Sequence, residues 1–380
     1  MSAVLIAAAR RTAVAPRHGA FAQVEVVALA DAVLRAVCDD TGVVLADIDE
    51  VILGNALYGG GNPARVAALS AGLPEALPAS TIDTQCCAGL DAILLAAARI
   101  RAGEADVIIA GGLESFSRAP LRAHRPRAAG AAPQPYERPP FTPWPARDPD
   151  MIPAAARLAA EWDMSRTAQE AFAVESHRKA LVRGPAAGEI VPVAGLASDA
   201  FARRLSPALC ARLPVLAGDA RHGVTAATVA VEADAAAAVL LVSEAGLRRL
   251  RPAGRPVRVL GGARRGGDPE RPGVAPVAAA QDAMRRSDVA LSDIAAAEIM
   301  EAFAVQAMIC ARELGLDPAL VNPGGGALAR GHPIGASGAI VAVRLWHELQ
   351  AARSGAVALG AIAAAGGLGS ALLLRMEDGP

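Results

Sequence analysis

The feature that most constrains the fold is an order of helix, strand and glycine that occurs twice along the chain. In the first third, an apolar helix is predicted over residues 89–103 and an apolar strand over residues 106–112. In the last third, the same order returns as a helix over residues 335–355 and a strand over residues 356–362. Strands that alternate with helices indicate a parallel α/β sheet with helices on both faces. Two such halves facing each other would bring both glycine-rich helix starts to one internal seam.

A chain of 380 residues is too long for one simple core, so we expect it to divide into parts. Residues 1–118 form the predicted N-terminal half, which residues 236–265 complete, and residues 256–380 form the C-terminal half. Residues 119–148 break the strand–helix order, because they are rich in Pro, Arg and Ala and have no period. A long irregular stretch inside a compact protein is usually functional or an excursion. We therefore predict that residues 119–245 are an inserted, mostly helical loop domain.

Composition and charge exclude several classes of partner. The formal net charge of −1 gives no bulk attraction to nucleic acid or to an anionic membrane. No window reaches about 18 uninterrupted apolar residues, so no transmembrane span is expected. The cysteines are odd in number and lack disulfide-framework spacing, which is typical of a protein in the reducing cytoplasm. They are Cys38, Cys86, Cys87, Cys210 and Cys310.

Cys86 is the first candidate for chemistry. A short strand ends just before it and an apolar helix begins near Gly89, so its thiol lies at a helix N-terminus. Unpaired N–H groups and the helix dipole stabilise a thiolate there, which predicts a lowered pKa and a nucleophilic sulfur. The alternative is that Cys86 and Cys87 are small buried apolar side chains, as free cysteines often are. Because neighbouring residues at a strand end face opposite ways, we expect Cys87 to point into the core.

His332 is the second candidate, because it lies in a glycine-rich run over residues 331–338, GHPIGASG. Glycines on both sides of a histidine allow the backbone to approach a ligand closely. Such a histidine could activate a cysteine or polarise a thioester oxygen. The alternative is a glycine-rich turn that contains an incidental histidine. No cluster has metal-ligand spacing, and no glycine run matches a dinucleotide fingerprint or a P-loop, so we expect no metal and no covalently bound cofactor.

Longer motifs give the chain a family likeness. They are Gly61–Arg65 (GNPAR), Cys86–Ala92 (CCAGLDA), Gly111–Ser115 (GGLES), Glu301–Ala304 (EAFA) and Val321–Gly338 (VNPGGGALARGHPIGASG). On these motifs the chain resembles the thiolase family from about residue 4 to residue 375. The resemblance implies the thiolase fold, with two similar mixed-sheet βαβαβαββ halves packed as a five-layer αβαβα core, plus an inserted loop domain. It also implies a homodimer or homotetramer, since family members are usually dimers or tetramers.

The same resemblance implies roles for single residues. Cys86 matches the nucleophile that takes an acyl group from coenzyme A as a thioester. His332 matches the histidine that helps to activate this cysteine and binds the thioester oxygen of the second substrate. The amides of Cys86 and of Ala365, which precedes Gly366, match an oxyanion hole, and Phe303 belongs to the pocket. In the family the reaction is thiolytic cleavage of a 3-ketoacyl-CoA or the reverse Claisen condensation.

The chain departs from the family pattern at positions that matter for chemistry. Met300 stands where the family has an asparagine that holds a water in a second oxyanion hole. Ala363 stands where the family has a second cysteine, the acid/base that moves the α-proton of the substrate. Asp83 and the segment 225–231 also differ from the family asparagine and coenzyme A-channel motif. A lost oxyanion donor commonly lowers the rate on the order of 10²–10³-fold, and a lost general base roughly 10²–10⁴-fold.

Three functions are compatible with this pattern. The first, which we favour, is a thiolase-like acyltransferase in which Cys86 takes an acyl group from acyl-CoA and passes it to an acceptor that needs no carbon acid removed. Such acceptors include a thiol, an amine, a hydroxyl, a carrier protein or a decarboxylating malonyl unit. The second is a functioning thiolase in which Cys87 or another group replaces the missing base. The third is a non-catalytic thiolase-fold subunit that partners an active homologue.

Overall fold

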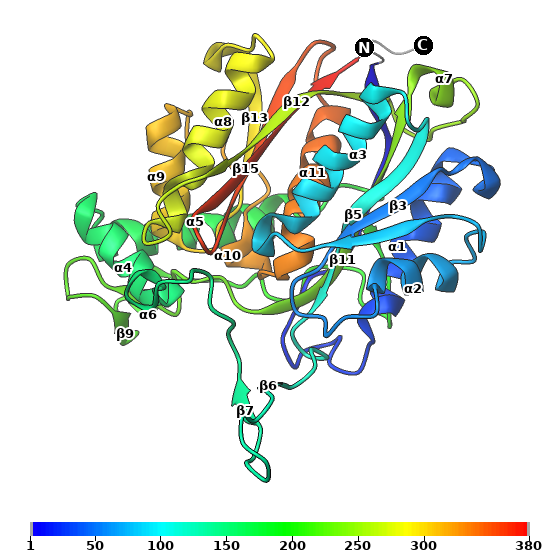
Figure 1. The fold of residues 1–380 in the computed structure, drawn as a ribbon. Helices are drawn as coiled ribbons and strands as arrows, with labels where there is room; N and C mark the ends of the chain where they lie inside the picture. The colour runs from blue at the N-terminus through cyan, green and yellow to red at the C-terminus, as the bar shows by residue number, and fades with distance from the viewer. Residues whose placement is uncertain (1–2, 378–380) are drawn as a thin grey trace.

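The computed structural model describes residues 3–377 and shows the five expected αβαβα layers (Figure 1). The central layer consists of α3 (Ala88–Ala102) and α11 (Ile334–Gln350). A β-sheet lies on each side of these two helices (Figure 1). Further helices cover the outer faces of the sheets, with α1 (Val26–Thr41) and α2 (Pro63–Ser70) on one side and α8 (Ala275–Arg286) and α9 (Ala304–Leu314) on the other.

The strands repeat the same topology in both halves. In the N-terminal half the order is β1 (Val4–Thr12), β11 (Ala233–Ser243), β5 (Val107–Ser115), β3 (Glu50–Gly54) and β4 (Ala79–Ile82). In the C-terminal half it is β12 (Val257–Gly266), β15 (Leu368–Met376), β14 (Val357–Ala364) and β13 (Ile294–Ile299). The β3–β5 and β13–β14 pairs are parallel, whereas β5–β11 and β14–β15 are antiparallel. The repeat predicted from the sequence is therefore confirmed.

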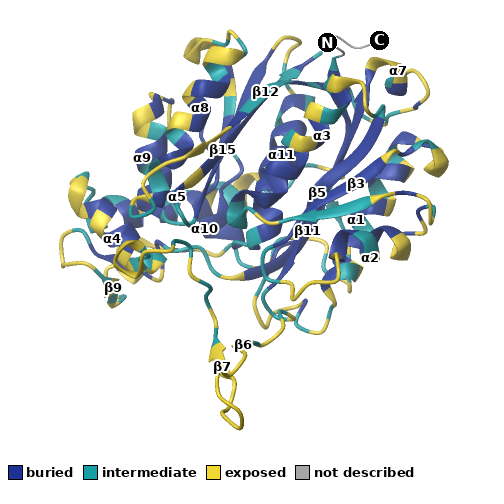
Figure 2. Ribbon diagram, in the orientation of Figure 1, coloured by how far each residue is buried: buried dark blue, intermediate teal, exposed yellow. Residues whose placement is uncertain are grey.

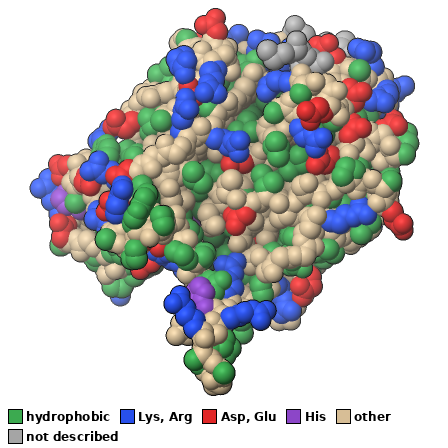
Figure 3. Space-filling view, viewed as in Figure 1, with side chains coloured by type: hydrophobic (Ala, Val, Ile, Leu, Met, Phe, Trp, Pro, Cys, Tyr) green, Lys and Arg blue, Asp and Glu red, His purple; other side chains and the backbone are tan. Residues whose placement is uncertain are grey.

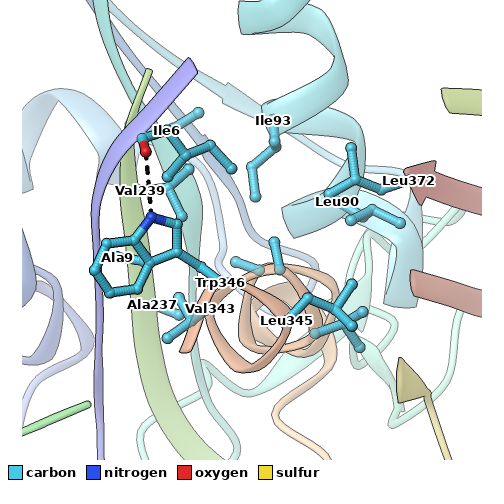
Figure 4. Close-up of a cluster of buried hydrophobic side chains, with 14 of the residues drawn as sticks. Ile6, Ala9, Leu90, Ile93, Ala237, Val239, Val343, Leu345, Trp346 and Leu372 are labelled. Atoms are coloured by element: carbon cyan, nitrogen blue, oxygen red, sulfur yellow. Dashed lines mark hydrogen bonds between the residues drawn. The ribbon is translucent and has the colours of Figure 1, made fainter. Parts of the chain in front are cut away.

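The two halves meet where β1 and β12 pair antiparallel through two residue pairs, Leu5 with Arg258 and Ile6 with Val257. On the inner side of this junction, α11 presents Trp346, whose indole N–H donates to the carbonyl of Ile6 at 3.2 Å (Figure 4). Almost every residue of α11 is buried, as expected of a helix in a central layer (Figure 2).

Glycines allow α3 and α11 to touch at their first turns. A methyl group built on Gly89 would lie 2.7 Å from the backbone nitrogen of Ala339. A methyl group built on Gly338 would lie 2.5 Å from the backbone nitrogen of Leu90. No side chain fits at these distances, so glycine is required at both positions. The close approach places the residues before α3 next to the residues before α11, which is the internal seam predicted from the sequence.

The chain between β5 and β11 makes a long excursion from the core. Its helices are α4 (Met151–Glu161), α5 (Arg166–Arg183) and α6 (Pro207–Cys210), and its strands are β6 (Arg122–His124), β7 (Gln134–Tyr136), β8 (Ile190–Val191), β9 (Val215–Ala217) and β10 (Val224–Thr225). The β6–β7 hairpin projects away from the body and is largely exposed (Figure 2). Ser165 caps α5, because its hydroxyl accepts from the N–H of Ala168 at 3.2 Å.

Several elements were not predicted. The strand β15 and the helix α4 escaped the sequence analysis, and α11 ends at Gln350 rather than at Gly355. The strand β15 is buried on both faces, so its sequence lacks the alternation of a half-exposed strand. The remaining short elements are β2 (Ala15–Pro16), α7 (Glu244–Leu247) and α10 (Ala327–Arg330). On the face drawn in Figure 3, basic and acidic side chains are interspersed.

Candidate active site

Cys86 lies in a tight turn between β4 and α3. Residues 85–87 form one turn of 3₁₀ helix, and Gln85 adopts a left-handed conformation with φ of 57°. The carboxylate of Asp83 accepts from the N–H of Gln85 at 2.8 Å, which fixes the turn. The turn places the half-buried thiol of Cys86 in the wall of a cavity of about 260 Å³.

His332 reaches the same point from the loop between α10 and α11. Its backbone N–H donates to the carbonyl of Val231 at 2.8 Å, which holds the loop against the chain that leads into β11. Its ring nitrogen Nε2 lies 3.1 Å from Sγ of Cys86, and Nδ1 lies 2.7 Å from the hydroxyl of Ser337. The two residues that the sequence singled out are therefore in direct contact, although 246 positions separate them in the chain.

The hydroxyl of Ser337 determines which ring nitrogen of His332 carries the proton. Ser337 lies in the first turn of α11, and its O–H donates to the carbonyl of Pro333 at 3.1 Å. Because that bond uses the only hydroxyl proton, the oxygen must accept from Nδ1–H of His332. Nε2 then carries a free lone pair directed at Cys86. The geometry is that of a nucleophile, a general base and a group that orients the base.

Burial governs the charge state of the pair. It raises the pKa of the Cys86 thiol to about 12, although the backbone N–H groups of Cys86 and Ala365 act in the opposite direction. Burial also lowers the pKa of His332 to about 3. The resting pair is therefore a neutral thiol beside a neutral imidazole. The predicted lowering of the Cys86 pKa by the helix N-terminus is wrong, because desolvation outweighs the backbone dipoles.

The cavity is lined mainly by apolar side chains. Besides Cys86 and His332, its ionisable lining residues are Glu232 and Arg271, and each has an ion-pair partner, Arg17 and Glu161 respectively. Gln85 and Gln306 add two amides. The apolar lining comes from the excursion and from the C-terminal half: Phe141, Met151, Ala154, Ala155, Leu158, Val229, Ala230, Pro272, Gly273, Ala302, Phe303, Ile334, Ala363, Ala364 and Ala365.

The other residues singled out by the sequence are divided between two places. Ala363, Ala365 and Phe303 line the cavity with the Cys86–His332 pair. Met300 does not line it and instead borders a separate cavity of about 20 Å³. Gly366, next to Ala365, has a positive φ of 78° in the turn between β14 and β15.

Cys87 points away from the cavity, as predicted. It is completely buried, and its thiol donates to the carbonyl of Ile362 at 3.5 Å. Burial raises its pKa above the ordinary value of a thiol. Cys87 is therefore a core side chain. The alternative interpretation, that both cysteines are buried apolar side chains, thus describes Cys87.

Two supporting residues were missed by the sequence analysis. Ser337 is one, and its position five residues after His332, in the first helical turn, was the available signal. Glu114 is the other. Its carboxylate accepts from the N–H groups of Ala56 and Gly335, both at 3.0 Å, and so fixes the start of α11 behind His332. Burial raises the pKa of Glu114 to about 7.

Within residues 3–377, no group of three or more His, Cys, Asp or Glu side chains could hold a metal ion. In the same range, no helix is long and apolar enough to cross a membrane.

The comparisons agree over nearly the whole chain. A family model described as "Thiolase, N-terminal domain" matches residues 4–245, and one described as "Thiolase, C-terminal domain" matches residues 255–376. The chain is 38% identical over 399 aligned residues to a protein of Pseudomonas aeruginosa named "Acetyl-CoA acetyltransferase", and the match covers 99% of this chain and all of the relative. A crystal structure of an acetyl-CoA acetyltransferase from Bacillus anthracis superposes with a TM-score of 0.90 at 31% identity, covering 99% of both chains.

Proposed function

The chain belongs to the thiolase family, and we propose that it is an acyltransferase in which Cys86 takes an acyl group from an acyl-CoA and passes it to an acceptor. The observation that carries the proposal is the 3.1 Å contact between Sγ of Cys86 and Nε2 of His332 in the wall of an apolar cavity. Relatives named as acetyl-CoA acetyltransferases support a coenzyme A thioester as the acyl donor.

Loading begins when His332 takes the proton of the Cys86 thiol, because the thiolate is the nucleophile. The sulfur attacks the thioester carbonyl and forms a tetrahedral oxyanion. We expect the N–H groups of Cys86 and Ala365, which lower the pKa of the thiol, to donate to this oxyanion. Coenzyme A then leaves as a thiol, and Cys86 carries the acyl group.

Ordinary carbon–carbon chemistry is impaired in this proposal. Condensation and thiolysis require a group that moves a proton on the α-carbon, and the methyl group of Ala363 cannot do so. Cys87 is no substitute, since its buried thiol does not line the cavity. We therefore infer that the acceptor needs no α-proton removed, as with a thiol, an amine, a hydroxyl, a carrier protein or a decarboxylating malonyl unit.

The two other functions, a functioning thiolase and a non-catalytic subunit, require different features of the site. A functioning thiolase would need another base, and Glu232 is the carboxylate that lines the cavity. Glu232 is half exposed, and its carboxylate is already engaged in an ion pair with Arg17 at 2.8 Å. A non-catalytic subunit would need no contact between Cys86 and His332, so that contact favours an enzyme over such a subunit.

Intact-mass spectrometry after incubation with acetyl-CoA and longer acyl-CoAs tests the proposal. The wild-type protein should gain one acyl group, and Cys86→Ala should gain none. Cys87→Ala is the matched control, since it removes the neighbouring thiol and should still be acylated. Absence of an adduct with every acyl donor would reject both enzymatic functions and leave the non-catalytic subunit.

Assembly and location complete the proposal. The strand β4 pairs only with β3 among the described residues, so its outer edge is open for pairing with a second copy. This edge supports a homodimer or homotetramer, which light scattering would measure. The five free cysteines support a reducing compartment, which we take to be the cytoplasm.

A further inference from the structure

A small cavity lies beside the residue that orients His332. It has a volume of about 20 Å³, which is room for one water molecule. Ser337, whose hydroxyl bonds Nδ1 of His332, lines this cavity. Glu298 of β13 and Arg330 of α10 line it too. The space is the size of one water, and these three polar side chains all border it.

Glu298 has an oxygen without a hydrogen bond. Its side chain is 2% exposed, and Oε1 accepts no hydrogen bond from any described residue. The nearest cations lie beyond ordinary hydrogen-bond distance, with Arg344 Nε at 3.6 Å from Oε1 and Arg330 Nη2 at 3.5 Å from Oε2. A buried carboxylate oxygen without a donor is unfavourable, so a bound water that donates to it would stabilise the fold.

Loading of Cys86 needs a place for its proton. An imidazolium at His332 is disfavoured by burial, and among residues 3–377 the ring contacts Ser337 and Cys86 but no carboxylate. The proton on Nδ1 faces Ser337, and Ser337 borders the cavity that also contains Glu298. A water bound in this cavity would complete a route from Cys86 through His332 and Ser337 to Glu298.

We propose that a water bound in this cavity links Ser337 to Glu298, and that Glu298 holds the proton displaced from Cys86 while the acyl group is transferred. Glu298 acts through Ser337 and His332 and does not touch the substrate, so it is a positioning residue. The inference rests on the proposed function, since it explains how the Cys86–His332 pair is activated for loading.

The proton transfers balance. The thiol proton of Cys86 moves to Nε2 of His332 as Nδ1–H passes to Ser337. The Ser337 hydroxyl turns from the carbonyl of Pro333 to the water, and a water proton reaches Glu298. After the carbon–sulfur bond to Cys86 forms, Nε2–H protonates the departing sulfur of coenzyme A. The relay then reverses, and Glu298 returns to the carboxylate.

The surroundings of Glu298 suit this role. Burial raises its pKa, the guanidinium groups of Arg344 and Arg330 lower it, and the carboxylates of Glu348 and Glu301 raise it. The net result is a pKa above the ordinary range of a glutamate. A carboxylate in this state accepts a proton more readily than an exposed one would.

The test is the rate of Cys86 alkylation by iodoacetamide at pH 7, followed by peptide mass spectrometry. This reaction needs an activated thiol but no acyl-CoA. It therefore tests the proton relay separately from the proposed acyl transfer. Glu298→Gln cannot take a proton and should slow alkylation on the order of 10²-fold. The wild-type rate should be slower in D₂O, and a plot of this rate against the fraction of D₂O should be curved, because more than one proton moves. The same plot for Glu298→Gln should be a straight line.

Glu348→Gln is the matched control. Glu348 also pairs with Arg344 at 3.1 Å, but it does not line the small cavity. Glu348→Gln removes a negative charge from the same group of side chains around Arg344, and it should leave the alkylation rate within about twofold of the wild-type rate. Equal slowing by both variants would mean a general effect of charge on the fold and would overturn the relay.

A double-variant comparison separates a relay from structural support. Ser337→Ala should slow alkylation, and adding Glu298→Gln to it should have no further effect, since both act on one route. Additive effects, or a wild-type rate in Glu298→Gln, would overturn the proposal.

If Glu298→Gln does not fold, Val14→Ile replaces it, because Val14 lines the cavity and the added methyl group would exclude the water. A wild-type rate in folded Val14→Ile would likewise overturn it.

Discussion

At the scale of single residues, the Cys86–His332 pair differs from the reactive thiolate that its helix position suggested. The buried pair is neutral, with pKa values near 12 for the thiol and 3 for the imidazole, so the proton leaves the thiol only as the reaction proceeds. The position at a helix N-terminus singled out the cysteine that contacts His332, but it predicted the wrong direction for the pKa of its thiol. Burial of the site could not be seen from the local sequence, because the residues that line it come from many segments that are distant in the chain.

The neutral pair predicts an unusual pH dependence for Cys86. Neither pKa lies between pH 7 and pH 9, so the rate of Cys86 alkylation by iodoacetamide should be nearly flat over that window. His332→Gln removes the internal base, and its slower rate should rise roughly tenfold per pH unit, as for an unassisted thiol. A wild-type rate that rises tenfold per unit would contradict a neutral, base-assisted pair.

At the scale of elements, the contact between α3 and α11 sets the distance between Cys86 and His332. Both helices begin with glycines that the sequence analysis picked out, and the repeated helix–strand order correctly predicted that they would face each other. The strand β15 was missed because it follows β14 directly, without the intervening helix of the helix–strand repeat from which β5 and β14 were predicted. The division into 1–118, 119–245 and 256–380 stays a prediction.

Substitution of Gly338 should disturb both stability and the site. The added methyl group of Gly338→Ala would lie 2.5 Å from the backbone of Leu90, so the helices must separate. Overpacking of this kind should lower the free energy of unfolding by about 1–3 kcal/mol and slow Cys86 alkylation, both measurable on the same sample.

Gly266→Ala is the control for this prediction. Gly266 ends β12, and a methyl group there would meet no atom within 4 Å. Its unfolding free energy and its alkylation rate should both stay near wild type. Equal stability of the two variants would show that the helices tolerate the added carbon.

At the scale of the whole molecule, the buried thiols make the free energy of unfolding depend on pH in the alkaline range. Burial raises the pKa of Cys38, Cys86 and Cys310 to about 12. In the unfolded chain these thiols ionise near pH 8.5, so above that pH the unfolded state binds fewer protons than the folded state. The stability they contribute is therefore complete below about pH 8.5 and is lost as the pH rises toward 12.

Urea unfolding at pH 8, 9 and 10 measures this linkage. In the wild-type protein, the free energy of unfolding should fall as the pH rises. Above pH 9, Cys310→Ala should lose about 1.4 kcal/mol less per pH unit than the wild type, because it lacks one thiol with a raised pKa. Cys310→Ala lowers stability at every pH by leaving a cavity, so the slope and not the level is the readout. Parallel slopes for the two proteins would contradict a raised pKa at Cys310.

The central claim is that Cys86 is loaded from acyl-CoA while carbon–carbon chemistry is limited by Ala363. Rapid-quench mass spectrometry with acetyl-CoA measures both steps at once in the wild-type protein and in Ala363→Cys. The wild type should release a burst of about one coenzyme A per chain and form only traces of acetoacetyl-CoA. Ala363→Cys, which restores a thiol in the cavity, should show the same burst and form acetoacetyl-CoA at least about tenfold faster. No burst from the wild type, or acetoacetyl-CoA formation at the rate of the variant, would contradict the account.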